Sequence, residues 1–121
     1  MASPTLKRAP LTGTTTNTNT ETKTFDTGQW NGNSGNITIQ IAITRASGAA
    51  AGTATPQISL DGVKWAAVPG QTAATLTDVA DQSFAWSLVD RKAIYYRVQL
   101  SSTGTGVLNS YVMFLEDEDK A

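Results

Sequence analysis

In the segment 36–46, isoleucine alternates with a Thr, Gln or Ala residue without exception over the eight residues 37–44. One set of alternate positions is isoleucine throughout, and the other is Thr38, Gln40, Ala42 and Thr44. A period of two is that of a β-strand with one dry face and one wet face. The segment therefore predicts a strand that contributes four side chains to a core, namely Ile37, Ile39, Ile41 and Ile43.

Similar alternation predicts strands at 83–89, 93–101 and 107–115, with a first short strand at 24–30 and a brief one around 74–77. In 83–89 the inward residues are Phe84, Trp86 and Leu88, and in 93–101 they are Ile94, Tyr96, Val98 and Leu100. The last strand is apolar on both faces. One face carries Leu108, Val112 and Phe114, and the other carries Val107, Tyr111, Met113 and Leu115. Either this strand lies beneath another layer, or one of its faces meets a partner.

Asp61-Gly62 lies between two alternating runs, which is a strong signal for a two-residue hairpin turn. Such a turn sets Ile58 opposite Trp65 and Leu60 opposite Val63, all four on the buried face. A competing turn with Gly62 in a left-handed bulge sets Ile58 against Lys64. We favour the first register because it keeps Lys64 out of the core.

No segment has a sustained 3.6-residue apolar stripe, so the expected fold is all-β. Seven or eight short antiparallel strands predict a two-sheet sandwich of jelly-roll type with an extended N-terminal arm. We expect an arm at 1–23, a β-sandwich domain at 24–115 and an acidic tail at 116–121. The arm is rich in Thr, Asn and Pro, and is either a disordered leader or a segment that becomes ordered on a partner.

Composition narrows the functional classes. The 121 residues include no Cys and no His, so thiolate metal sites, disulfides and His-dependent triads are excluded. Only 16% of residues are charged, and the net charge is −1. We therefore expect no nucleic-acid partner, and no apolar run suggests a membrane span or a signal peptide. Synthesis in the cytoplasm is the expectation.

Carboxylates are what remain for catalysis. Asp78 and Asp81 lie three apart, but each suits a turn residue that bonds nearby backbone N–H groups. The acidic tail lacks the spacing of a formed calcium loop. The sequence therefore predicts a protein without catalytic residues, metal or cofactor.

Exposed aromatics suggest an alternative, since sugars stack on open rings. Trp65 and Trp86 alternate with aliphatic neighbours and are interpreted as core, which leaves Trp30 and Tyr95 as the candidate platform. Under this hypothesis the chain is a carbohydrate-binding or adhesin module of a phage tail or fibre.

The motifs SLDGVKW (59–65) and YYRVQL (95–100), followed by STGTG and a final apolar strand, resemble small β-sandwich virion proteins of tailed bacteriophages. The resemblance covers roughly residues 55–115 and rests on structural motifs of low specificity. It implies a non-enzymatic capsid decoration or cement protein, located on the virion and bound to the major capsid protein or another virion protein. It also implies a homo-oligomer, for which we expect a trimer.

Two contact regions are expected under that resemblance. The coat-binding arm is Pro4, Leu6, Lys7, Arg8 and Leu11, and the self-association face is Val107, Tyr111, Met113 and Leu115.

Overall fold

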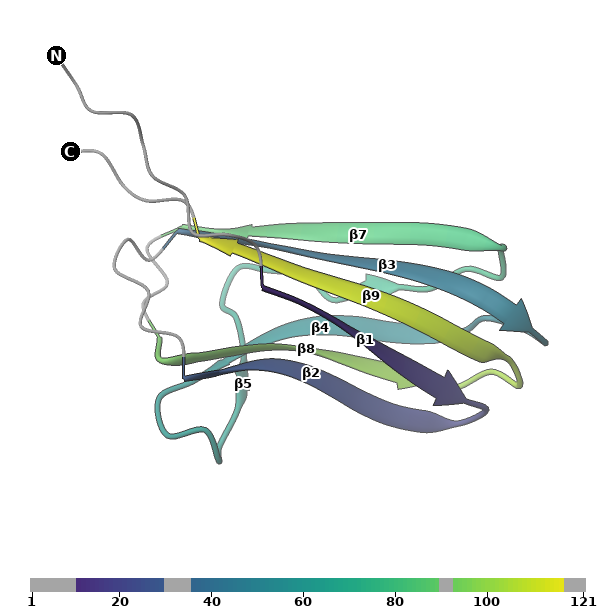
Figure 1. The fold of residues 1–121 in the computed structure, drawn as a ribbon, viewed down its shortest axis with the longest axis horizontal. Helices are drawn as coiled ribbons and strands as arrows, with labels where there is room; N and C mark the ends of the chain where they lie inside the picture. Colours follow the sequence, from purple (N-terminus) through teal and green to yellow (C-terminus); the bar gives the residue numbers. More distant parts are fainter. Residues whose placement is uncertain (1–10, 30–35, 90–92, 117–121) are drawn as a thin grey trace, which may run out of the picture.

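The fold is an antiparallel sandwich of two β-sheets (Figure 1). The computed structural model describes residues 11–29, 36–89 and 93–116. The strands are β1 (Leu11–Thr18), β2 (Glu21–Gln29), β3 (Ile37–Ser47), β4 (Gly52–Ser59), β5 (Ala66–Ala67), β6 (Ala74–Thr75), β7 (Asp81–Leu88), β8 (Tyr95–Ser102) and β9 (Val107–Glu116). In the described part of the chain no helix could cross a membrane.

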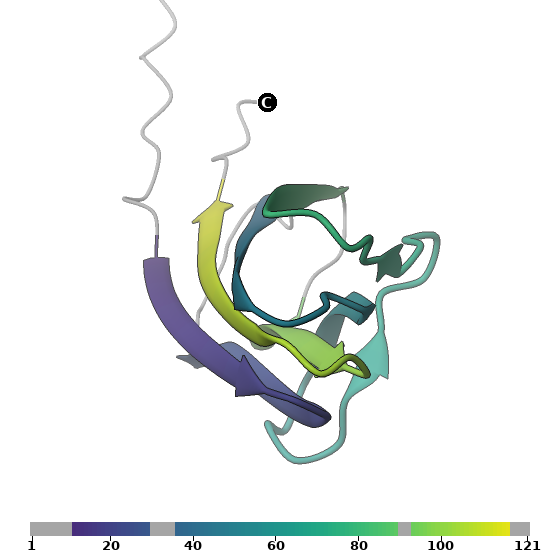
Figure 2. The same cartoon turned by 90° about the vertical axis from the view of Figure 1, so that its right-hand side faces the viewer.

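The pairing of the strands is nested along the chain. β1 pairs with β9, β2 with β8, β3 with β7, and β4 with β5 and β6. The four-stranded sheet has the order β1-β9-β3-β7, and the other has the order β2-β8-β4-β5 with β6 also on β4. Figure 2 looks roughly along the strands and shows the two layers. A long hairpin folded over on itself in this way is the jelly roll that the sequence predicts.

The core lies between the two sheets and follows the predicted alternation. The four isoleucines of β3 are at most 2% exposed, while Thr38, Gln40 and Thr44 on the other face are exposed. The inward residues of the partner strands include Trp86, Leu88, Tyr96, Val98, Leu100, Leu108, Val112 and Phe114. These predictions are confirmed.

The boundary of the expected arm is corrected. Residues 11–18 form β1 and residues 21–29 form β2, so the predicted boundary between residues 23 and 24 lies inside β2. Apolar patterning gave no sign of β1, because its inward positions after Leu11 are Gly13, Thr15 and Asn17. Phe25 of the opposite sheet fills the space over Gly13. Residues 1–10 lie outside the described part of the chain.

The hairpin register is also corrected. Ile58 pairs with Ala66 and Gln57 with Ala67, so the segment 59–65, which begins with the last residue of β4, forms a wide loop in place of a two-residue turn. Leu60 and Val63, expected in the core, are 70% and 77% exposed. The reason is local: side-chain oxygens of Ser59 and Asp61 accept the loop's N–H groups, as Ser and Asp commonly do in turns.

Pro56 lies inside β4, although proline in sheets is commonly found at the first residue of a strand or on an edge. Its carbonyl accepts a hydrogen bond from Val68 N, so its ring nitrogen faces the side of β4 on which only the short β5 and β6 pair. Between these two strands no ladder bond is lost, which is where a sheet tolerates proline.

Candidate functional site

The outer face of the four-stranded sheet is formed by alternate residues of β1, β9, β3 and β7. We call it the neutral face. Its side chains are Thr12, Thr14, Thr16 and Thr18 of β1, Val107, Asn109, Tyr111, Met113 and Leu115 of β9, Thr38, Gln40, Ala42 and Thr44 of β3, and Asp81, Ser83, Ala85 and Ser87 of β7. All are exposed or half-buried.

Charge is nearly absent from the neutral face. Asp81 is its one ionisable carboxylate, and it lies at the corner where β7 pairs with Thr44 of β3. Asp and Lys are depleted at the centres of protein interfaces, because a charge there must be desolvated. The neutral face therefore has the composition of a contact surface.

Tyr111 is the exposed aromatic residue among the side chains of the neutral face. Its side chain is 44% exposed and stands on β9 between Thr14 of β1 and Ala42 of β3. Beside it is a shallow hollow of about 360 Å³, lined by Thr14, Thr15, Thr16, Ala42, Thr44, Asn109, Ser110 and Tyr111. Thr16 Oγ1 donates to Asn109 Oδ1 at 2.9 Å, which fixes the amide on one side of the hollow. A projecting ring and a recess therefore lie side by side.

The row expected for self-association lies on this face. Val107, Met113 and Leu115 are half-buried and Tyr111 is exposed. Of the two alternatives for the last strand, a covering layer is not found among the described strands, because none of them lies over this row.

Of the residues assigned to the coat-binding arm, only Leu11 is described. It is the first residue of β1, pairs with Phe114 and is 36% exposed. Pro4, Leu6, Lys7 and Arg8 lie outside the described residues. Leu11 is therefore part of the sandwich edge.

The loop 59–65 is a second ordered feature. Asp61 Oδ1 accepts hydrogen bonds from Val63 N and Lys64 N, both at 2.9 Å, and from Ser59 Oγ at 3.0 Å. The bonds from Lys64 N and Val63 N lower the pKa of the Asp61 carboxyl group, because they stabilise its charged form. Gly62 has φ of 75°, a left-handed conformation that glycine adopts readily.

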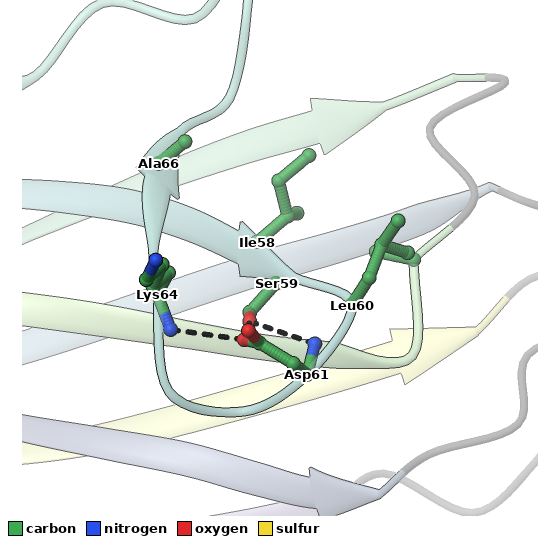
Figure 3. A pocket seen from close by; sticks show the side chains of 7 residues that line it. Ile58, Ser59, Leu60, Asp61, Lys64 and Ala66 are labelled. Atoms are coloured by element: carbon green, nitrogen blue, oxygen red, sulfur yellow. Dashed lines mark hydrogen bonds between the residues drawn. The ribbon is translucent and has the colours of Figure 1, made fainter.

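A pocket of about 470 Å³ opens between this loop and β5 (Figure 3). Ile58, Leu60, Ala66 and Ala93 supply its apolar wall, and Ser59, Asp61 and Lys64 its polar one. In Figure 3 the carboxylate of Asp61 lies within the loop's hydrogen bonds. That carboxylate is thus engaged in holding the loop.

Trp65, interpreted as core, lies on the outer side of the other sheet, and this interpretation is corrected. The Arg97 guanidinium carbon lies 4.2 Å from the centroid of its ring, and Tyr95 packs edge-on at 6.3 Å. Arg97 Nε donates to Gln57 Oε1 at 2.6 Å. Burial lowers the pKa of Arg97, while nearby Asp26 opposes that shift.

This packing bears on the candidate sugar platform. A Cβ at Gly62 would lie 3.1 Å from Cζ of Tyr95, so the loop backbone lies against that ring. Tyr95 is half-buried, with Trp65 packed edge-on against it, and the sugar platform stays a prediction. Trp30 lies outside the described residues.

The two carboxylates considered for catalysis have different surroundings. Asp78 Oδ1 accepts from Arg45 Nη1 at 2.6 Å and from Ala50 N at 3.0 Å, and these bonds lower its pKa. Asp81 belongs to the neutral face. In the described part of the chain no group of three or more Asp, Glu, His or Cys is placed to hold a metal ion.

Sequence reasoning missed the hollow beside Tyr111 and the threonine row of β1. The signal was present: residues 12–18 read TGTTTNT, with Thr at every second position from 12 to 18. A polar period of two marks an exposed strand face, but without apolar residues between them the segment looked like low-complexity sequence.

Comparison with known proteins supports the fold alone. No family model matches the chain, and no curated protein matches it. The crystal structure of the Yersinia pseudotuberculosis-derived mitogen is similar, with a TM-score of 0.58 at 12% identity over 93% of this chain and 90% of that chain. A Bacillus endospore appendage protein, from a family of disulfide-linked pili, gives a TM-score of 0.49 at 12% identity over 98% of this chain and 95% of that one. The chain is thus similar to an all-β protein of known structure, and these likenesses assign no function.

Proposed function

We propose that this chain is a non-enzymatic structural protein of an assembled particle, a decoration or cement protein on a phage capsid. The observation that carries the assembly role is the neutral face: among its side chains Asp81 alone carries a charge, and Tyr111 projects from its centre. The phage capsid as the particle rests on the sequence resemblance.

The mechanism is stabilisation by selective binding. A rigid sandwich that binds coat subunits only where two of them meet favours the assembled shell over separate subunits by mass action. The strand ladder already orders the backbone, and the face is rich in short Thr, Ser and Ala side chains, so less conformational entropy is lost when it is covered than on a surface of long flexible side chains.

The test is cosedimentation of the full chain with purified phage capsids and, in parallel, with dissociated coat subunits of the same phage. Binding to capsids alone, together with a higher temperature of capsid disruption, is the expected result. Binding to neither form, or equal binding to both, contradicts the proposal.

A truncation tests the arm separately. Removing residues 1–10 leaves β1 intact, whereas a longer deletion to residue 24 removes β1 and much of β2. The shorter deletion is therefore the informative one. Weaker capsid sedimentation with an unchanged unfolding midpoint supports a coat-binding role for Pro4 to Arg8, and unchanged sedimentation removes the arm from the proposal.

A further inference from the structure

We propose that two copies of this chain associate through their neutral faces, with Tyr111 of each copy seated over Asn109 in the hollow of the other. This inference rests on the proposed assembly role and names the occupant of the face as a second copy.

The neutral face is complementary to a second copy of itself when the two copies are related by a two-fold axis near Ser110. Consider a two-fold axis that lies between the two facing sheets, perpendicular to the strands and level with Ser110 of β9. This axis sets position 109 of one copy opposite position 111 of the other, and position 107 opposite position 113. Tyr111, the projecting ring, then meets Asn109 at the hollow, and the apolar Val107 meets the apolar Met113. An isologous contact requires such pairing of each feature with its complement on the same surface.

The lining of the hollow suits an aromatic ring with a hydroxyl group. Thr14, Thr16, Ala42 and Thr44 contribute methyl groups and small side chains, and Asn109 contributes an amide. A tyrosine ring placed there packs against the methyl groups while its hydroxyl reaches hydroxyl and amide partners. Tyrosine is enriched at interface hot spots for this combination of apolar ring and polar tip.

The area fits a weak dimer. Neighbouring side chains on one sheet face are spaced by about 6.7 Å along a strand and about 4.8 Å between strands. Twelve of the seventeen positions of the neutral face overlap under this axis, and they cover about 390 Å² in projection. Side-chain relief makes the buried accessible area larger, and interfaces below about 600 Å² per partner are those of weak, transient complexes.

Charge opposes the contact only weakly. Asp81 lies on edge strand β7, at the rim of such an interface, where its carboxylate stays in water. Two polar sheet faces without salt bridges give an association that depends little on ionic strength.

The experiment is sedimentation equilibrium of the full chain, compared with two variants of the neutral face. Tyr111→Ala removes the projecting ring, and Ala42→Trp fills the hollow while leaving Tyr111 in place. We expect a dimer for the unaltered chain and a dissociation constant at least tenfold higher for each variant. Leu60→Ala, on the loop and 70% exposed, is the matched control and should dimerise normally.

A second measurement does not depend on affinity. The chain has no cysteine, so Asn109→Cys and Val63→Cys each create a single thiol. A bismaleimide with an arm of about 12 Å, close to the spacing of stacked sheets, should link Asn109→Cys copies into dimers and leave Val63→Cys copies largely unlinked.

The outcomes separate the inference from the proposed function. A monomer at the highest soluble concentration, or equal cross-linking of both thiols, overturns the dimer. If such a monomer still sediments with capsids, the assembly role stands and its partner on the neutral face is coat protein. A dimer that binds no capsid leaves the inference intact and overturns the proposed function.

Discussion

Gly13 of β1 and Phe25 of β2 fit each other across the two sheets. A Cβ at Gly13 would lie closer than 3.0 Å to three ring atoms of Phe25, a separation that real Cβ contacts do not show. The same ring lies 5.9 Å, centroid to centroid, from Phe114 of β9. The absent side chain at position 13 is therefore the space that Phe25 occupies.

Gly13→Ala should accordingly destabilise the protein by about 1 to 3 kcal/mol, the range for overpacking a core. At an uncrowded strand position the same change is neutral or stabilising, because alanine restricts the unfolded chain. Urea unfolding measures the difference. Adding Phe25→Leu should recover part of the loss, and strictly additive effects of the two changes would contradict the proposed fit.

Asn17 is a buried polar residue in the same strand, with 0% exposure. Its Nδ2 donates to the carbonyl oxygens of Glu21 and Leu100, both at 3.1 Å, and so links β1 to strands of the other sheet. Asn17→Ala leaves two carbonyl groups without that donor and should cost about 1 to 3 kcal/mol of stability. Thr16→Ala, exposed on the same strand, is the control.

Asn17→Asp provides a sharper form of this prediction. A carboxylate in that position faces two carbonyl oxygens in a buried site, so its pKa should rise and its charged form should oppose folding. The loss of stability relative to the unaltered chain should be larger at pH 7 than at pH 4. Equal losses at both pH values would show that position 17 is accessible to water.

Sequence patterning identified the strands whose inward face is apolar. The period-two alternation of apolar residues predicted β3, with its isoleucines, and β8, with its inward row. The register of such strands follows from which residues must be buried. Apolar alternation did not predict β1, because a glycine, a threonine and an asparagine occupy its inner face. Its place depends on Phe25 and on carbonyl groups distant in sequence, which a local pattern does not contain.

The loop 59–65 shows a second limit of prediction from sequence patterns. Asp-Gly between alternating runs favours a tight turn, but Asp61 and Ser59 can satisfy the same N–H groups with side-chain oxygens. Both local arrangements satisfy backbone N–H groups, and the Asp-Gly rule considers only the tight turn. The neutral face was partly foreseen: β9 indicated an apolar row, whereas its hollow requires the neighbouring strands.

Acid should weaken the fold through Asp61 and Asp78. Both carboxyl groups have a pKa below the ordinary value of 3.8, because backbone N–H groups donate to them, with Arg45 also donating to Asp78. A group whose pKa is lower in the folded state stabilises it above its unfolded pKa and loses that contribution as the pH falls through and below that value. Stability measured by urea unfolding should therefore decline below about pH 4.

Asparagine substitutions test whether Asp61 and Asp78 cause the loss of stability in acid. Asp61→Asn and Asp78→Asn should each reduce stability at pH 7 and flatten the decline below pH 4, because the titrating group is gone. Thr44→Ala, on the exposed neutral face, removes no titrating group and is the control, so it should leave the decline unchanged. A decline of equal steepness in all three variants would assign it to other carboxyl groups.

Trp65 and Arg97 should be energetically coupled. The guanidinium group lies 4.2 Å from the ring centroid and is held by Gln57, so the pair meets the geometry of a cation–π contact in a partly desolvated position. A double-mutant cycle with Trp65→Ala and Arg97→Ala, measured by urea unfolding, should give a coupling of about 0.5 to 2 kcal/mol. A control cycle that pairs Trp65→Ala with Lys23→Ala should give none, since Lys23 is an exposed residue of β2 opposite Leu100. Coupling of the same size in both cycles would mean that Trp65→Ala disturbs the whole sheet, whereas coupling confined to the first identifies Arg97 as the residue that holds Trp65 against the outer side of the sandwich.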